Sequence, residues 1–318
     1  YEELQILRIS EENEVYRILY TLSSMVAGAS PVMHEDLSMI EKLDLILSKG
    51  KLSIDMDATE PAVNTARSIL LSDARHPLMD RKIAVPLQFD IGEKVRGIII
   101  TGPNTGGKTV AIKTVMLNCI MAQCGLHVTC KSADICMNSA YLCDIGDGQN
   151  LSENLSTFSA HITNVLEVIS EVNQDSFVIL DEMGSGTDPT EGMGIAIAIL
   201  EELRKSGAIF LVTTHYPEVK EYANQAEDIV NARMTFDKET LSPTYQMVIG
   251  EAGASCAFYI ADRLGMPAEM LKVAVRAAYG EDAVDAYQFR NTESTVVKTN
   301  TPKISRTKKA KSSAGLSH

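Results

Sequence analysis

The stretch Gly102-Pro103-Asn104-Thr105-Gly106-Gly107-Lys108-Thr109 decides the fold of this 318-residue chain. It fits the pattern Gly-x-x-x-x-Gly-Lys-Ser/Thr, in which glycines let backbone N–H groups surround a phosphate. A β-branched apolar run, Val95–Thr101, precedes it, and a helical segment at 109–123 follows it. A strand, this loop and a helix in that order predict a phosphate site at the start of the helix, where the helix dipole favours anions.

Two side chains of this loop carry the expected chemistry. The ammonium group of Lys108 would neutralise oxygens of the β- and γ-phosphates, and the hydroxyl of Thr109 would ligate Mg²⁺. The loop's other residues would bind phosphate largely through backbone N–H groups; they are Gly102, Pro103, Asn104, Thr105, Gly106 and Gly107. The sequence therefore predicts ATP and Mg²⁺ as ligands.

Apolar strands and helices alternate along the rest of this region. The expected strands are 177–180 and 209–213, and the expected helices are 109–123, 160–172 and 192–206. Such alternation predicts an α/β fold with a mainly parallel sheet that helices cover.

Polar residues follow two of these strands. Asp181 and Glu182 come directly after 177–180. In a phosphate-loop ATPase the first acid holds Mg²⁺ and the second polarises the attacking water. Thr213-Thr214-His215-Tyr216 follows the next strand. A lone histidine there usually only packs, but ligands of open α/β sheets bind at the carboxyl ends of the strands, so His215 is a candidate sensor of the γ-phosphate.

Ser156 and Thr157 precede the helix expected at 160–172. They stand where N-caps stand, so they either cap this helix or offer it to a phosphate held by another subunit. The residues alone leave both interpretations open. His127 and His161 have no comparable context and are expected only to pack or cap.

The flanking segments carry no predicted chemistry of their own. Residues 1–50 read as two helices, because Gly28-Ala29-Ser30-Pro31 interrupts an apolar stripe that resumes at about 34–47. Two further helices are expected at 255–264 and 267–278. Residues 281–318 are rich in Thr, Ser and Lys and are expected to be disordered.

Composition limits the class of protein. Lys and Arg number 29 against 42 Asp and Glu, a net charge of −13, which argues against a protein that coats a polyanion with its whole surface. No run approaches the roughly 20 apolar residues of a membrane span, and no secretory signal is visible. The six cysteines form no Cys-x-x-Cys pair, so we expect reduced thiols in a cytoplasmic protein.

Together these motifs resemble one family. The chain is similar to the ATPase domain of the MutS family, and within it to the type-two bacterial branch. The likeness rests on the phosphate loop, Ala74-Arg-His-Pro-Leu78, Leu155-Ser-Thr-Phe-Ser159, Asp181-Glu-Met-Gly-Ser-Gly-Thr-Asp188 and Thr213-Thr-His-Tyr216. It implies three parts: a helical core or lever remnant at 1–69, an ATPase domain at 70–280 and a disordered basic tail at 281–318.

The resemblance also implies an assembly. In this family the ATPase is ABC-like, and two copies pair head to tail so that each completes the partner's site. The signature segment maps onto Ser156, which would then contact ATP in trans. Residues 255–278 correspond to the helical dimerisation element, and 83–87 would approach the adenine.

Two departures limit the functional expectation. No Phe-x-Glu occurs, so the mismatch-reading wedge of type-one proteins is absent, and nuclease activity is not expected from these residues. The expected function is DNA-binding ATPase action in mismatch repair or suppression of recombination. The alternative is an ATPase that acts on stalled ribosomes, and a third possibility is a nucleotide-dependent dimerisation module alone. A homodimer without membrane attachment is expected in every case.

Overall fold

The computed structural model describes residues 1–102, 106–146, 157–237, 240, 242–253 and 256–286. The chain divides into two compact units, residues 1–256 and 257–318.

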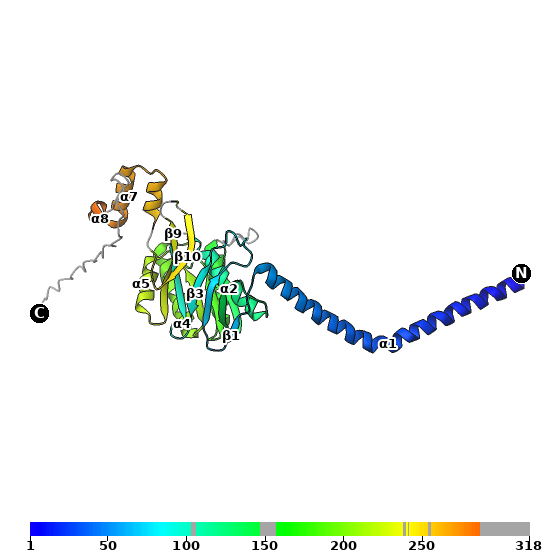
Figure 1. Ribbon diagram of the computed structural model, residues 1–318. Coiled ribbons are helices and arrows are strands. Elements are labelled where there is room, and N and C mark those ends of the chain that lie inside the picture. Colours follow the sequence, from blue (N-terminus) through cyan, green and yellow to red (C-terminus); the bar gives the residue numbers. More distant parts are fainter. Residues whose placement is uncertain (103–105, 147–156, 238–239, 241, 254–255, 287–318) are drawn as a thin grey trace, which may run out of the picture. The chain divides into compact units, whose positions relative to one another are not determined.

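A six-stranded sheet forms the centre of the first unit (Figure 1). Its strands pair in parallel except for the antiparallel edge strand β10. Their order is β10 (Ser242–Ile249), β9 (Ile229–Asp237), β4 (Gly97–Thr101), β8 (Ile209–Thr213), β7 (Ser176–Leu180) and β6 (Ala140–Asp144). The predicted α/β fold with a mainly parallel sheet is confirmed.

The middle strands are buried on both faces, which explains their continuous apolar sequences. Successive side chains point to opposite faces. In β4, Ile98 and Ile100 therefore enter one hydrophobic cluster and Ile99 enters the other. The same alternation divides the side chains of β7 and β8 between the two clusters.

Helices cover both faces of this sheet. The helix α2 (Lys108–Gln123) contributes to the first cluster. The second cluster receives side chains from α3 (Thr157–Glu171), α4 (Pro189–Ser206) and α5 (Pro217–Gln225). Helix α4 begins before the predicted residue 192 because the Asp188 side chain accepts hydrogen bonds from the N–H groups of Thr190 and Glu191.

A second sheet of four strands was not predicted. Its order is β1 (Ala62–Asn64), β5 (Ser132–Cys136), β2 (Ile69–Ala74) and β3 (Leu87–Ile91). Ile69, Phe89 and Ile135 from this sheet share the first hydrophobic cluster with α2. Strand pairing thus begins at residue 62, inside the segment expected to be helical. The proposed division at residues 69 and 70 stays a prediction.

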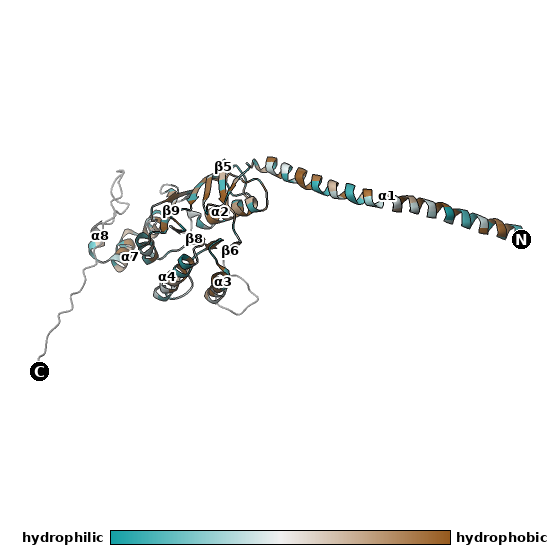
Figure 2. Ribbon diagram, turned by 90° about the horizontal axis from the view of Figure 1, so that it is seen from below, coloured by the Kyte–Doolittle hydropathy of each residue, from teal (hydrophilic) through white to brown (hydrophobic). Residues whose placement is uncertain are grey.

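Helix α1 (Glu2–Met56) is continuous, so the predicted break at 28–31 is wrong. Pro31 lies inside the helix, where the missing N–H and the bulky ring can kink a helix without ending it. The ribbon of α1 bends about halfway along its length (Figure 1). No residue of α1 is buried, and apolar and polar residues mix along it (Figure 2). No described helix is long and apolar enough to cross a membrane.

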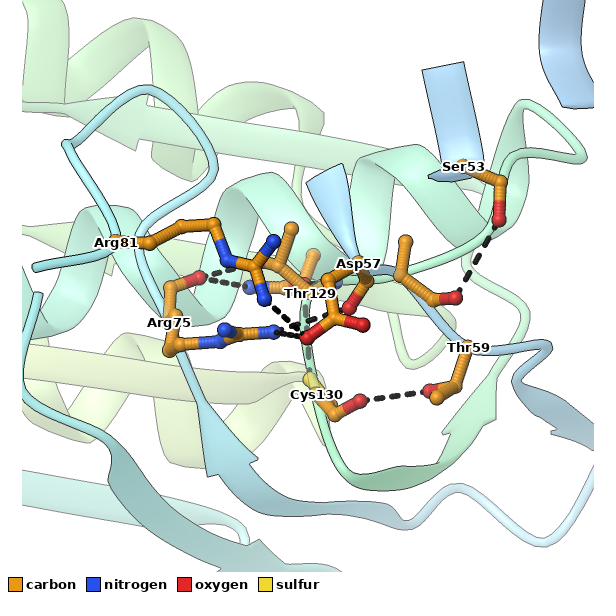
Figure 3. A network of polar contacts seen from close by, with 9 residues as sticks. Ser53, Asp57, Thr59, Arg75, Arg81, Thr129 and Cys130 are labelled. Carbon is orange, nitrogen blue, oxygen red and sulfur yellow. Dashed lines mark hydrogen bonds and ion pairs between the residues drawn. The ribbon is translucent and has the colours of Figure 1, made fainter. Parts of the chain in front are cut away.

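Asp57 forms the joint between α1 and the strands (Figure 3). It caps α1 in the left-handed conformation, with φ at +50°. Its carboxylate pairs with Arg81 and, at 3.5 Å, with Arg75, which also donates to the Asp57 carbonyl at 3.0 Å. Two turns earlier, Lys49 donates to two carbonyls just after α2, at 3.2 and 3.3 Å. Nearby polar side chains complete the network of Figure 3: Ser53, Thr59 and Thr129.

The second unit contains α6 (Ala257–Arg263), α7 (Ala268–Tyr279) and α8 (Asp282–Ala286). The first two helices match those expected at 255–264 and 267–278, and the rings of Phe258 and Tyr279 meet edge to face at 5.8 Å. Helix α8 falls where disorder was expected from residue 281. Its first turn is closed by a 3.3 Å hydrogen bond from the Ala283 N–H to the Gly280 carbonyl. Residues 287–318 lie outside the described part.

Candidate nucleotide site

Gly107 ends the connection from β4 and caps α2. Its φ of +84° lies in the left-handed region, where a side chain causes strain. A Cβ here would lie 2.5 Å from a ring carbon of Tyr245. Both the backbone conformation and the neighbouring ring therefore require glycine at this position.

Lys108 begins α2 with its side chain buried, and its ammonium donates to the Gly102 carbonyl at 2.8 Å. Burial lowers the pKa of this ammonium to about 8, although the nearby carboxylates of Glu182 and Asp181 act in the opposite direction. The charge of Lys220 lowers the pKa further. A desolvated cation beside the N–H groups of a helix start is suited to bind a polyanion such as a triphosphate.

Asp181 lies buried just after β7, and two threonine hydroxyls hold its carboxylate. Thr109 donates to Oδ2 at 2.6 Å, and Thr213 donates to Oδ1 at 2.5 Å. Thr109 and Asp181 thus bring a hydroxyl and a carboxylate oxygen together. Mg²⁺ prefers oxygen ligands of this kind and takes only one or two carboxylates from the protein, so these residues fit the predicted ion.

Glu182 and His215 face each other at the carboxyl ends of β7 and β8. The Glu182 carboxylate lies 3.5 Å from Nε2 of His215, and this nitrogen lies 3.4 Å from the Lys108 ammonium. Burial, aided by the positive charge of Lys108, lowers the pKa of His215 below its usual value. The imidazole is therefore neutral at pH 7. The side chains of Glu182 and His215 remain 37% and 40% exposed, which leaves both accessible to a ligand.

The structure brings together most of the predicted site residues. Three neighbouring strand ends supply them, because β4, β8 and β7 are adjacent in the sheet. The described members are Gly102, Gly106, Gly107, Lys108, Thr109, Asp181, Glu182 and His215. Pro103, Asn104, Thr105 and Ser156 lie outside the described residues. The catalytic and binding roles of all these residues stay predictions.

A hollow beside the phosphate loop contains residues that sequence reasoning missed. It is lined by part of the segment expected near the adenine, including Ile83 and Val85, and also by Tyr245 and His76. Tyr245 lies where the register of β10 against β9 shifts, with φ at +55°. The local sequence gives no signal for this bulge, so the approach of an aromatic ring to Gly107 could not be predicted from it.

His161 does more than pack or cap. Its Nδ1 lies 2.7 Å from the buried carboxylate of Asp144, at the end of β6. Asn164, one turn later in α3, donates to the other oxygen at 3.0 Å. The Asp144 carbonyl accepts the N–H of Asp181 at 2.9 Å. Asp144 therefore connects the first turns of α3, through its side chain, to the end of β7 that carries the two acids, through its backbone carbonyl.

Comparisons with known proteins agree with this arrangement. The family model described as MutS domain V, a phosphate-loop ATPase domain, matches residues 98–280. A protein named Endonuclease MutS2 from Brevibacillus brevis is 41% identical over 281 residues, which cover 88% of this chain and 36% of the relative. Proteins of the same name from Ruminiclostridium cellulolyticum and Clostridioides difficile are 45% and 44% identical over 84% and 83% of the chain. The chain spans about a third of the length of these relatives, 34% for the last two.

Proposed function

Because this chain belongs to the MutS family, in its type-two branch, we propose that it binds ATP and hydrolyses it to ADP and phosphate as the motor of a DNA-associated protein. The observation that carries the proposal is the meeting of Lys108, Thr109, Asp181, Glu182 and His215 at three adjacent strand ends. Each residue type there matches one requirement of phosphoryl transfer to water.

The chain's own groups would divide the work. Lys108 and the N–H groups at the start of α2 bind the phosphates and stabilise the charge that develops on them. Glu182 is accessible and has its carboxylate beside His215, so it orients the attacking water and accepts its proton. The neutral imidazole of His215 has an N–H to donate to the γ-phosphate. Thr109 and Asp181 would hold Mg²⁺, which when bound neutralises charge on the phosphate oxygens.

The adenine would occupy the hollow beside Gly107, which the ring of Tyr245 lines next to that glycine. Rings of this kind stack on nucleobases with offset or edge-on geometry. The apolar side chains of Ile83 and Val85 would complete the contact surface.

We also infer an ABC-type arrangement in which two copies of the chain pair head to tail. Ser156 would then reach the γ-phosphate bound by the partner, and the helices at 257–279 would serve dimerisation. The family membership supports this assembly. His161 in α3 contacts the Asp144 carboxylate, and the Asp144 carbonyl accepts the N–H of Asp181. These contacts would keep α3, the helix that follows the signature segment, in a fixed position relative to the two acids.

The test is steady-state ATP turnover by the purified chain and its variants. Glu182→Gln removes the base but leaves the phosphate contacts, so we expect ATP to remain bound while hydrolysis is lost. Lys108→Ala should weaken ATP binding itself. Glu202→Gln is the matched control, because this exposed acid near the end of α4 pairs with Lys205 in the same helix and should leave turnover unchanged. Unimpaired turnover in Glu182→Gln would contradict the proposal.

The target of the motor is a separate part of the proposal. We propose mismatched or branched DNA, contacted through parts of the protein beyond this chain, in repair or in suppression of recombination. Stalled ribosomes are the competing target, because the same motor serves either. Binding of the longer protein to junction DNA, mismatched duplex and stalled ribosomes separates them. The relatives carry the word endonuclease in their names; we assign no nuclease step to the described residues.

A further inference from the structure

We propose that Thr213 is a positioning residue that sets both acids of the site at once. The inference rests on the proposed ATPase function and names a residue that the reaction requires without contact to the reacting atoms. Thr213 ends β8, the strand between β4 and β7, and its side chain is completely buried.

A single hydroxyl makes two contacts there. It donates to Oδ1 of Asp181 at 2.5 Å and accepts the backbone N–H of Glu182 at 2.7 Å. A hydroxyl has one proton to donate and lone pairs that accept, so both contacts can exist together. The backbone carbonyl of Thr213 accepts a third hydrogen bond, from the N–H of Met183 at 3.0 Å. Thr213 therefore holds three consecutive residues of the neighbouring strand end.

The backbone of Glu182 explains why these contacts matter. Its φ of +49° lies in the left-handed region, where the Cβ of a non-glycine residue crowds the backbone. Such a conformation persists only where the surroundings hold it. Thr213 holds it from both sides, through the N–H of Glu182 and the N–H of Met183. Because the direction of a side chain follows its backbone, these bonds fix the Glu182 carboxylate beside His215.

The two threonines around Asp181 differ in origin. Thr109 comes from the phosphate loop, and its hydroxyl is itself a predicted Mg²⁺ ligand. Thr213 comes from the strand that leads to His215, and its hydroxyl turns to the carboxylate oxygen opposite to the one that Thr109 contacts. Outer-shell partners of a ligating carboxylate typically change metal affinity or activity about 10- to 100-fold when they are removed.

The experiment compares Thr213→Val with Thr213→Ser in the 318-residue chain. Valine keeps the volume and β-branching but can neither donate nor accept, whereas serine keeps the hydroxyl. We expect Thr213→Val to lower kcat about 10- to 100-fold and to raise the Mg²⁺ concentration for half-maximal turnover. The KM for ATP should change less, and Thr213→Ser should restore kcat. Ser176→Ala is the matched control, because it removes a buried hydroxyl at the opposite end of β7 that accepts the Asn173 N–H.

A second readout does not depend on turnover. Mn²⁺ binding with ADP present, followed by electron paramagnetic resonance, should weaken in Thr213→Val and recover in Thr213→Ser. Thr213→Ala provides the hydroxyl-free comparison with serine if valine prevents folding. Wild-type kcat and Mn²⁺ affinity in the hydroxyl-free variants would overturn the inference, as would equal defects in Thr213→Ser. If the wild-type chain hydrolyses ATP and this turnover depends on Glu182, such results overturn only the inference about Thr213. If the wild-type chain shows no turnover, both the proposed ATPase function and the inference about Thr213 are overturned.

Discussion

The Thr109 hydroxyl donates a hydrogen bond of 2.6 Å to the carboxylate of Asp181, 72 residues later in the chain. The contact crosses the sheet, because β8 lies between the strand before Thr109 and the strand before Asp181. It holds the start of α2, directly after the phosphate loop, next to the first acid. The predicted metal site therefore depends on strand order as well as on the two motifs.

Thr109→Val should separate nucleotide binding from hydrolysis. The variant loses one oxygen ligand but keeps Lys108 and the loop backbone, so ATP binding without metal should be nearly unchanged. Turnover should fall, and saturation with Mg²⁺ should require a higher concentration. Titration of ATPase activity with Mg²⁺ checks this. Thr163→Val is the control, since that exposed hydroxyl donates to the Ser159 carbonyl in the same helix; an equal loss in both variants would contradict the assignment.

Tyr245→Leu tests where the adenine of ATP binds. Loss of the ring removes the stacking surface beside Gly107 and should raise the KM for ATP several-fold, with kcat little changed, because stacked aromatic contacts contribute about 0.5–1.5 kcal/mol. Tyr245→Phe keeps the ring and serves as the control. A fall in kcat with unchanged KM would place Tyr245 in the chemistry of the γ-phosphate instead.

The six-stranded sheet with its nucleotide motifs is easier to predict from the sequence than the four-stranded sheet, for a physical reason. Strands buried on both faces, such as 97–101 and 209–213, are continuous apolar runs, and the motifs directly follow them. The second sheet includes the three-residue strand Ala62–Asn64, whose partner Ser132–Cys136 lies far along the chain. The role of Thr213 was also missed, because the pairing of its hydroxyl depends on which strand lies beside β8. Long-range pairing of this kind leaves no periodic signal in the local sequence.

Asp57 provides a test of the joint at the end of α1. At this left-handed position glycine has no steric penalty, whereas alanine costs about 1–2 kcal/mol. Both substitutions remove the exposed ion pairs with Arg75 and Arg81, which contribute about 0–1 kcal/mol each. Asp57→Ala should therefore unfold at a lower temperature than Asp57→Gly, the reverse of the usual order in a helix. The measurement is the midpoint temperature of thermal unfolding for Asp57→Ala and Asp57→Gly. Equal midpoints in the two variants would contradict the predicted backbone strain.

Ser156→Ala tests the proposed head-to-tail assembly. If Ser156 acts on the partner's nucleotide, the variant should lower ATPase activity at protein concentrations where dimers form and leave a dilute monomer unaffected. Turnover measured across a concentration series, with sedimentation to assign the oligomer, distinguishes the cases. Ser170→Ala, at the other end of α3, is the control. The same proportional fall at every concentration would favour simple capping of α3.

Lys108 gives ATP binding a pH dependence of defined sign. Burial lowers the pKa of its ammonium to about 8, while bound phosphates favour the charged form and so raise the pKa in the complex. Between these two values the complex carries a proton that the free protein lacks, so binding takes up protons and affinity falls as the pH rises through about 8. In the free protein Glu182 and Asp181 act to raise the pKa of Lys108 and Lys220 acts to lower it, and burial lowers the pKa of His215 away from this pH range. Calorimetry at pH 8.5, which lies about half a unit above that pKa, in two buffers of different ionisation enthalpy should show proton uptake in wild type. Lys108→Arg keeps its charge throughout and should show none, so equal uptake in both proteins would assign the proton to another group.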